Sequence, residues 1–409
     1  YNLPDYRQDI VKVIKERGEL RFDEVKAMEG AAWIKGSLVF KVLYRSDKQE
    51  GKISCLRGEI PFQERLNMDG LSDSYAVHAT GDMEDLTIGV INSRKLNVRA
   101  VIVLTASSEK EVDEELTCEL SDGSSYEQNI VEKEALKLLV VRRDICRQKS
   151  EAVLPSSKPN IREILWQSMQ LRNVESRLVE GNIRLSGEIL VSILYNDEEE
   201  GEHLSWYETT VPLDAQAECG VMEDDCIWQV QMVPLTMELE VKPDYDGEER
   251  ILVMELALDT HIRIWKEEKI RLLTDLYSLQ KEVKPVFREC PLERLLVKNA
   301  AKCRMTEQME LKEDKEKVLQ ICSCEGKVLL ERQEIKTDGV LAEGTVEVNI
   351  LYITPDDHMP VGAVQEIYPF SQLVEIPEMS AQAKVELDAS LEQLSAVMLD
   401  QEHVGIRAA

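Results

Sequence analysis

Histidines and cysteines are the side chains of this chain best suited to bind a metal or to act as nucleophiles. No two of the five histidines lie at metal-ligand spacing, and none accompanies a nucleophile motif. Cys322-Ser-Cys324 has one residue between its thiols and no second ligand pair nearby, so we interpret both as ordinary strand cysteines. We therefore assign no catalytic, cofactor-binding or metal-binding residue. The histidines are His78, His203, His261, His358 and His403.

The nine cysteines are odd in number and show no repeating spacing. A disulfide framework would be expected to recur with each structural unit, so free thiols in a reducing cytosol fit this pattern better. The cysteines stand at positions 55, 118, 146, 219, 226, 290, 303, 322 and 324.

Carboxylates are the other potential catalysts, but the chain has 78 of them, too many for spacing to select a glycosidase pair. Asp244-Tyr-Asp246-Gly247 is similar to a calcium loop, yet it lacks a third acidic ligand and the final Glu, so we predict an exposed hairpin tip. A P-loop, a dinucleotide fingerprint and a nucleophile elbow are all absent from the sequence. We predict that the protein is not an enzyme.

The charge of the chain limits the partners that it can bind directly. There are 49 basic and 78 acidic side chains, which gives a net charge of −29. Nucleic acids and anionic lipids are bound through Lys and Arg, so both are disfavoured. No stretch approaches the roughly 18–20 apolar residues of a membrane span. A basic protein partner is compatible with this charge, although solubility alone also explains it.

A nine-residue motif occurs three times and shows how the chain is organised. Its copies are GSLVFKVLY (36–44), GEILVSILY (187–195) and GTVEVNILY (344–352). The final tyrosines are 151 and 157 residues apart, and a Pro in an apolar context follows each of them after 17 residues. A period of this length indicates a repeated domain rather than a solenoid. We predict three tandem repeats, spanning 1–134, 135–280 and 281–409.

The motif itself has a functional and a structural interpretation. Tyr44, Tyr195 and Tyr352 could form a platform for stacking sugars. A tyrosine that closes an apolar strand more often packs its ring on the core and leaves its hydroxyl in water, and we predict this arrangement. We also predict that the glycine opening each motif admits a bend or a close backbone approach.

The sequence pattern within a repeat predicts mainly β-strands. Residues 75–91, 95–107 and 383–399 are rich in alternating or β-branched apolar residues. Helical spacing occurs in 8–17 and 160–170, where we predict short helices after Pro-containing turns. With six or seven strands in about 130 residues, we predict a mainly β fold of three tandem β-sandwich or barrel-like repeats, with short helices in connections.

The repeats differ at their ends. Strand-like segments precede the second repeat, at 135–155, and the third, near 282–311, whereas nothing comparable precedes Leu3-Pro4. The last strand of the third repeat stops at Ala409, which aligns with Val101 in the middle of its counterpart. We expect a fragment of a longer protein, in which the first repeat lacks its N-terminal strand and the third is truncated in its last strand.

Two segments resemble the Leu-Pro-x-x-(Lys/Arg)-Pro-Asp-Ile signature of the SPOCS-domain family. They are LPDYRQDIVKVI (3–14), with Gln8 for the second Pro, and LPSSKPNIREIL (154–165), with Asn160 for Asp. The third repeat has lost the signature and reads MELKEDKEKVL (309–319), so its assignment rests on its nine-residue motif and the proline that follows.

The resemblance implies a role in the endospores of Firmicutes. The best-known member of the family is a spore-coat morphogenetic protein with a C-terminal LysM module, which this sequence does not contain. The resemblance implies a cytoplasmic protein of the mother cell that helps to anchor the coat at the forespore surface. It would bind coat morphogenetic proteins, including the coat-assembly ATPase. The family supplies no catalytic residues, and the partner-binding residues are unknown.

We weigh three classes of function. The first is a non-enzymatic scaffold or adaptor in spore-coat assembly. The second is a β-sandwich protein of the envelope that binds carbohydrate or peptidoglycan, although its tryptophans do not recur in register. The third is a hydrolase with paired carboxylates. The tryptophans are Trp33, Trp166, Trp206, Trp228 and Trp265.

Overall fold

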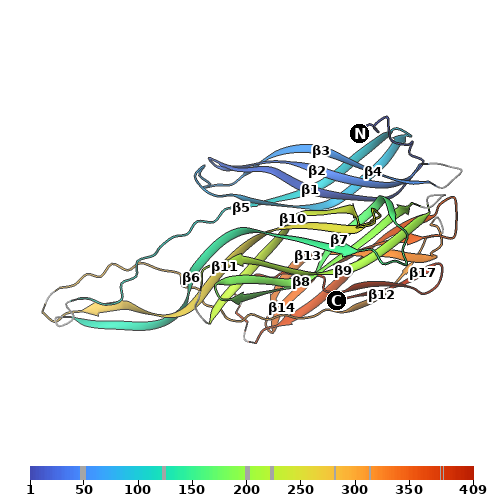
Figure 1. The fold of residues 1–409 in the computed structure, drawn as a ribbon. Helices are drawn as coiled ribbons and strands as arrows, with labels where there is room; N and C mark the ends of the chain where they lie inside the picture. The colour runs from blue at the N-terminus through green and yellow to red at the C-terminus, as the bar shows by residue number, and fades with distance from the viewer. Residues whose placement is uncertain are drawn as a thin grey trace.

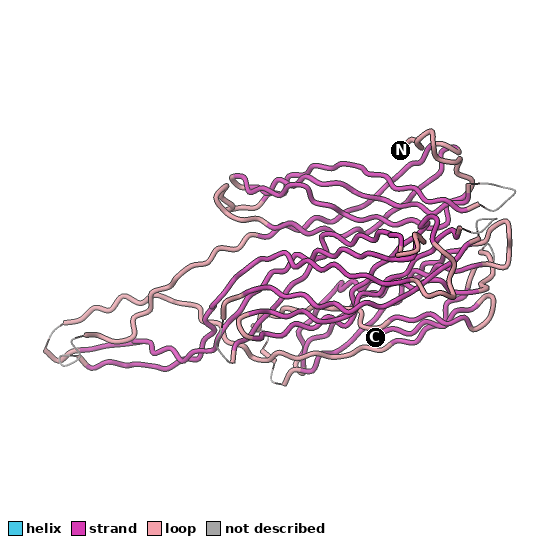
Figure 2. The backbone as a smooth tube through the Cα atoms, viewed as in Figure 1, coloured by secondary structure: helices cyan, strands magenta, loops and turns pink. Residues whose placement is uncertain are grey.

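The computed structural model describes most of the chain and is built from β-strands alone (Figures 1 and 2). Among the described residues, no helix occurs. The predicted mainly β fold is therefore confirmed, whereas the predicted short helices are not found. The described residues are 1–46, 52–121, 126–198, 203–221, 225–280, 282–312, 315–377, 379–380 and 382–409.

The first repeat is a sandwich of two antiparallel sheets. One sheet has the order β1-β2-β3 and the other consists of β4 and β5. The central strand of the larger sheet, β2, carries the nine-residue motif. The strands are β1 (Lys12–Met28), β2 (Ala31–Arg45), β3 (Ile53–Asn67), β4 (His78–Asn92) and β5 (Lys95–Ser107).

The second repeat has the same plan with one more strand. Its sheets have the orders β7-β8-β9 and β10-β11-β6, and β8 carries the motif. The ends of β6 and β11 continue as a ribbon that projects beyond the sandwiches (Figure 1). The strands are β6 (Glu127–Val153), β7 (Ile161–Val179), β8 (Asn182–Asp197), β9 (Leu204–Glu218), β10 (Cys226–Pro243) and β11 (Glu249–Tyr277).

The third repeat matches the second but has short strands in one sheet. Its sheets have the orders β13-β14-β15 and β12-β17-β16, and β14 carries the motif. The strands are β12 (Met305–Glu310), β13 (Gln320–Lys336), β14 (Gly339–Ile353), β15 (Val361–Glu375), β16 (Leu394–Met398) and β17 (His403–Ala408).

A leader strand, β6 or β12, precedes the second and third repeats and pairs with the central strand of its sheet. Both leaders fall where the sequence predicts strand-like segments, although β12 covers only the end of 282–311. In the first repeat the equivalent central strand is β5, and the only described residues on its second edge are Tyr1–Asn2.

The predicted helices at 8–17 and 160–170 are wrong, and a β-bulge explains the error. Both segments run into the strand that pairs first with the motif strand, β1 or β7, and an extra residue interrupts that pairing once within 8–17 and twice within 160–170. Ile164 therefore packs in the core of the second repeat while its neighbour Leu165 packs on the opposite face. Because the bulge breaks the two-residue alternation, the apolar residues acquire a spacing that imitates a helix.

The predicted strand over 383–399 is also largely wrong. Only Leu394–Met398 forms a strand, which pairs with β17. Because β17 is six residues long, the residues before Leu394 have no strand to pair with, and their alternating pattern does not produce β structure. A strand pattern needs a partner strand as well as alternation.

Candidate functional site

The tyrosine of each motif is a core residue in all three repeats. Tyr44, Tyr195 and Tyr352 are each 0% exposed. Each hydroxyl donates to the backbone carbonyl 36 residues earlier, at Gln8 (3.2 Å), Pro159 (3.1 Å) and Glu316 (3.0 Å) respectively. The prediction that the hydroxyl is in water is therefore wrong, and the sugar-stacking alternative fails with it because the rings are inaccessible.

Those carbonyls belong to a turn that the signature residues build. The amide of Arg7 donates to the carbonyl of Pro4 at 2.9 Å, and Lys158 and Pro155 repeat this at 2.9 Å. The third repeat keeps the same turn without proline, because Lys315 donates to Lys312 at 2.9 Å. The signature is lost there in sequence, but the equivalent backbone hydrogen bond remains.

An arginine holds the turn in the first two repeats and is replaced in the third. Arg94 Nη2 donates to the carbonyl of Pro4 at 2.9 Å, and Arg94 Nη1 pairs with Asp9 Oδ1 at 2.8 Å. Arg250 binds the equivalent carbonyl of the second repeat and also Asn160. In the third repeat the polarity is reversed, since Lys317 Nζ pairs with Glu402 Oε1 at 3.2 Å.

The glycine that opens each motif lies opposite a second bulge. A Cβ on Gly36 would stand 2.5 Å from the carbonyl oxygen of Arg21, and one on Gly344 would stand 2.1 Å from that of Leu329. Gly187 is in the same position, 2.9 Å from the oxygen of Arg172. The prediction of a close backbone approach is confirmed, and any side chain here would force the strands apart.

The leucine before each tyrosine points to the opposite face of the motif strand. Leu43, Leu194 and Leu351 are buried together in one apolar cluster that contains residues of all three repeats. The residue directly opposite each leucine, on the third strand of the sheet, joins the same cluster. We call this cluster the junction. Its buried members are Leu43, Ile53, Leu165, Trp166, Leu194, Cys322, Leu351 and Val361.

Equivalent strands meet in a closed cycle at the junction. Strand β3 contacts β7, β9 contacts β13, and β15 contacts β1. The third strand of each motif sheet therefore touches the first strand of the next repeat, and the last repeat returns to the first. The contacts therefore follow a cyclic order through the three sandwiches, which lie against one another in Figure 1.

A buried ion pair at the junction also connects all three repeats. Lys15 Nζ lies 3.0 Å from Glu325 Oε1, and Arg17 Nη1 lies 3.1 Å from Glu325 Oε2. Trp166 of the second repeat donates to the same carboxylate at 3.3 Å. Burial alone would raise the pKa of Glu325, but the two cations outweigh it and hold that pKa below its ordinary value. Glu325 is therefore a buried carboxylate that contacts the first and second repeats from the third.

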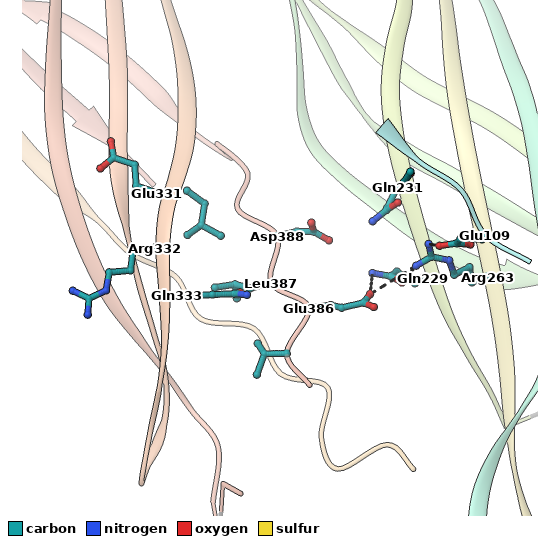
Figure 3. A pocket seen from close by; sticks show the side chains of 13 residues that line it. Glu109, Gln229, Gln231, Arg263, Glu331, Arg332, Gln333, Glu386, Leu387 and Asp388 are labelled. Carbon is teal, nitrogen blue, oxygen red and sulfur yellow. Dashed lines mark hydrogen bonds and ion pairs between the residues drawn. The ribbon is translucent and has the colours of Figure 1, made fainter. Parts of the chain in front are cut away.

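A polar groove of about 600 Å³ lies between the second and third repeats (Figure 3). Arg263 of β11 forms an ion pair with Glu109 from the segment after β5 and lies 4.0 Å from Glu386 Oε2. Gln229 Nε2 also donates to Glu386 at 2.7 Å. Because Arg263 contacts both carboxylates, the groove is better suited to hold the repeats together than to supply an acid and a base.

Of the cysteines and histidines that the sequence singled out, His78 and His261 lie close together, with their ring centroids 6.0 Å apart. Burial raises the pKa of Cys322 and of Cys324 to about 12, so both thiols stay protonated. His203 and His358 are exposed. Within the described parts of the chain, no group of three or more His, Cys, Asp or Glu side chains is placed to hold a metal.

The segment with a calcium-like pattern is a tight hairpin between β10 and β11. Asp244 Oδ1 accepts the amides of Asp246 (2.9 Å) and Glu248 (3.0 Å), and Tyr245 is fully exposed. The prediction of an exposed hairpin tip is confirmed. The described residues also contain no helix that is long and apolar enough to cross a membrane.

Sequence reasoning missed the junction and its ion pair. A comparison of aligned positions could have found it. Arg17, Ser168 and Glu325 occupy the same position of the three repeats, yet their side chains are basic, neutral and acidic. A charged residue in a strand position that is polar but uncharged in a sister repeat indicates a contact specific to one copy.

Comparison with known families identifies two of the three repeats. The family described as SipL, SPOCS domain matches residues 9–91 and 317–399. The first match covers most of the first repeat, and the second covers most of the third, whose signature the sequence had lost. No curated protein and no solved structure matches the chain.

Proposed function

Because residues 9–91 and 317–399 belong to the SPOCS-domain family, we propose that the chain is a non-enzymatic scaffold in the assembly of the bacterial endospore coat. The family match is the observation that carries this proposal. The geometry is compatible with it, since the junction joins three similar sandwiches through one apolar cluster. A scaffold needs surfaces for its partners and does not need a catalytic cleft.

The proposed partners are other coat morphogenetic proteins, including the coat-assembly ATPase at the forespore surface. The proposed location is the cytoplasm of the mother cell, whose reducing conditions suit a chain with nine cysteines that lack a repeating disulfide pattern. The net charge of −29 favours partners with basic surfaces. In the family, recruitment of the ATPase is associated with the LysM module, so the contribution of the repeats has to be measured separately.

The alternative of carbohydrate or peptidoglycan binding has less support. A stacking platform needs exposed aromatic rings. Trp166 is buried, and the other four tryptophans are half-buried. A pull-down with peptidoglycan that retains the protein would revive this alternative.

The test combines binding and localisation. The purified three-repeat chain, and the same chain extended by a LysM module, are each titrated with the purified ATPase. We expect the three-repeat chain to retain measurable binding to at least one purified coat protein. In sporulating cells, deletion of the gene should leave the coat mislocalised, and normal encasement of the forespore would rule the proposal out.

A further inference from the structure

Three basic side chains stand side by side on the motif sheet of the first repeat. Arg17 of β1 is paired with Lys41 of β2, and Lys41 is paired with Arg57 of β3. Cross-strand partners point to the same face of a sheet, with their Cβ atoms about 5 Å apart. Like charges in this arrangement repel one another, so it is unfavourable unless an anion lies against it. We call these three residues the basic row.

The basic row occurs in the first repeat alone. In each of the other two repeats, the equivalent row has one carboxylate and no basic residue. In a chain with a net charge of −29, three adjacent cations are a local exception. The row is therefore a property of the first repeat and not of the fold. The equivalent residues are Ser168, Ser192 and Glu208 in the second repeat, and Glu325, Asn349 and Gln365 in the third.

The basic row lies beside the junction. Lys41 precedes the junction residue Leu43 by two positions on β2, so both side chains point to the same face of the sheet. Arg17 reaches across to Glu325 of the third repeat at 3.1 Å. Strand β3, which carries Arg57, contacts β7 of the second repeat. A ligand bound to the row would therefore lie where the three repeats meet.

Two of the three cations have no partner. Arg17 pairs with Glu19 and with Glu325, both at 3.1 Å. Lys41 and Arg57 form no hydrogen bond and no ion pair within the described parts of the chain. Lys41 is half-buried, and an ammonium group that has lost part of its water without gaining a partner is unfavourable. The row therefore has two positive charges that a ligand can neutralise.

The electrostatic surroundings of Lys41 agree with this. Burial lowers the pKa of Lys41 below its ordinary value of 10.5, and the neighbouring Glu19 offsets this effect only in part. The two arginines of the row lower the same pKa further. An anion placed against the row would act in the opposite direction, because it favours the charged form of the lysine.

A buried hydroxyl of the second repeat lies at the same register position. Ser168 is 3% exposed, and its hydroxyl has no hydrogen-bond partner among the described residues. Ser168 follows the junction residue Trp166 by two positions on β7, the strand that contacts β3. Its hydroxyl therefore faces the junction side of the sheet and can supply one more donor beside the three cations.

We propose that the basic row binds a phosphate group, to which Ser168 donates a further hydrogen bond. A phosphate group carries close to two negative charges at neutral pH, which matches the two cations without partners. Arginine binds phosphate oxygens through two parallel hydrogen bonds, and lysine adds a compact charge. The net charge of −29 disfavours anions elsewhere on the chain. This site does not depend on the coat role, because it follows from the basic row alone.

Isothermal titration calorimetry with inorganic phosphate tests the site. The three-repeat chain is titrated at pH 8, and sodium chloride keeps the ionic strength constant. We expect one phosphate to bind per chain with a Kd of about 1 mM or less. Succinate carries its two charges on separate carboxylates and should bind at least about tenfold more weakly. No saturable binding of phosphate, or equal binding of succinate, would overturn the proposal.

The variant Lys41→Met removes a charge of the row and keeps the length of the side chain. Its affinity for phosphate should fall about tenfold or more. Its urea midpoint without phosphate should be unchanged or higher, because repulsion within the row is relieved. Arg57→Gln changes an exposed residue and should lower the affinity by a similar factor, so it decides the matter if Lys41→Met does not fold. An unchanged affinity in Arg57→Gln would overturn the proposal.

The matched control is Lys35→Met, which removes a cation from the same face of β2. Lys35 and Lys41 lie about 20 Å apart along the strand. The affinity of Lys35→Met for phosphate should therefore stay within about twofold of the natural value. An equal fall in Lys35→Met and Lys41→Met would show a general effect of charge and would overturn the proposal. Ser168→Ala should lower the affinity about fivefold, and an unchanged affinity would remove this hydroxyl from the site.

Discussion

Strands β2, β8 and β14 each have one face turned into their own sandwich and one turned toward the junction. On the inner face the three repeats carry the same residue in the same setting, as Tyr44, Tyr195 and Tyr352 show. Near the junction, equivalent positions of the neighbouring strand hold different residues, such as Ser168 and Glu325. The inner face of each sandwich packs in the same way and therefore keeps the same residues. The faces that meet at the junction contact different repeats, so they must be complementary rather than identical.

The largest expected effect tests the equivalence of the inner faces. Tyr→Ala at position 44, 195 or 352 removes a fully buried ring and a hydrogen bond, and each change should cost about 3–5 kcal/mol of stability in its own repeat. Hydrogen-exchange mass spectrometry resolves the three repeats separately. The control Tyr→Phe keeps the ring and should cost only about 1 kcal/mol. Clearly unequal costs among the three positions would show that the inner faces are not equivalent.

The second prediction tests the complementarity of the outer faces. Glu325→Leu leaves Lys15 buried at the junction without its closest partner and should cost about 3 kcal/mol. Adding Lys15→Met should recover most of that loss, because no charge remains to be paired at that position.

The matched control lies at the equivalent position of the second repeat. Ser168 is buried, and among the described residues its hydroxyl has no hydrogen-bond partner. Ser168→Ala should therefore change the stability by less than about 0.5 kcal/mol. Urea denaturation measures all three variants. If Ser168→Ala lowers the free energy of unfolding as much as Glu325→Leu does, the difference between serine and glutamate at this position does not affect stability.

The third prediction concerns pH at the same carboxylate. The pKa of Glu325 is held below its ordinary value of 4.5 in the folded protein, so the unfolded state binds its proton more readily. Its stabilising effect is complete above pH 4.5 and is lost as the pH falls through the lower, folded value. The urea midpoint should therefore fall more between pH 7 and pH 3 in the wild type than in Glu325→Gln. Identical pH profiles would contradict a stabilising carboxylate.

The sequence was sufficient for the features that repeat. Alignment of the motif found the number of repeats, and the β-branched runs found β4 and β5 to within a few residues. These features are set by periodicity and local propensity, which are properties of the chain itself. The bulges were not predictable in this way, because a single inserted residue in one strand is visible only once its partner strand is known.

The contacts at the junction were even harder to predict from the sequence than the bulges. Lys15 and Glu325 are 310 residues apart, and each alone looks like a solvated charge on a strand. Only the folded arrangement of three similar sheets brings them together. The buried hydroxyls of the motif tyrosines were missed for a related reason, since their acceptors lie on a turn whose path the sequence does not specify.

The smallest expected effect concerns the turn whose charges are reversed in the third repeat. Lys317 and Glu402 are both more than half exposed, so their pairing should be worth only about 0.5 kcal/mol. Lys317→Asp places two carboxylates together and should destabilise the turn slightly, and Glu402→Arg should do the same with two cations. The double variant recreates the polarity of Asp9 and Arg94 and should recover the loss.

A double-mutant cycle at low and high salt measures this coupling, which should shrink as salt screens the exposed charges. The double variant should also gain something that the natural pair lacks. In the first repeat, Arg94 donates to the carbonyls of Pro4 and Arg7, and an arginine at position 402 could reach the equivalent carbonyls of Lys312 and Lys315. Stability above that of the natural chain would show that the arginine acts mainly through the turn's backbone. Recovery to the natural level alone would show that only the charge pair matters.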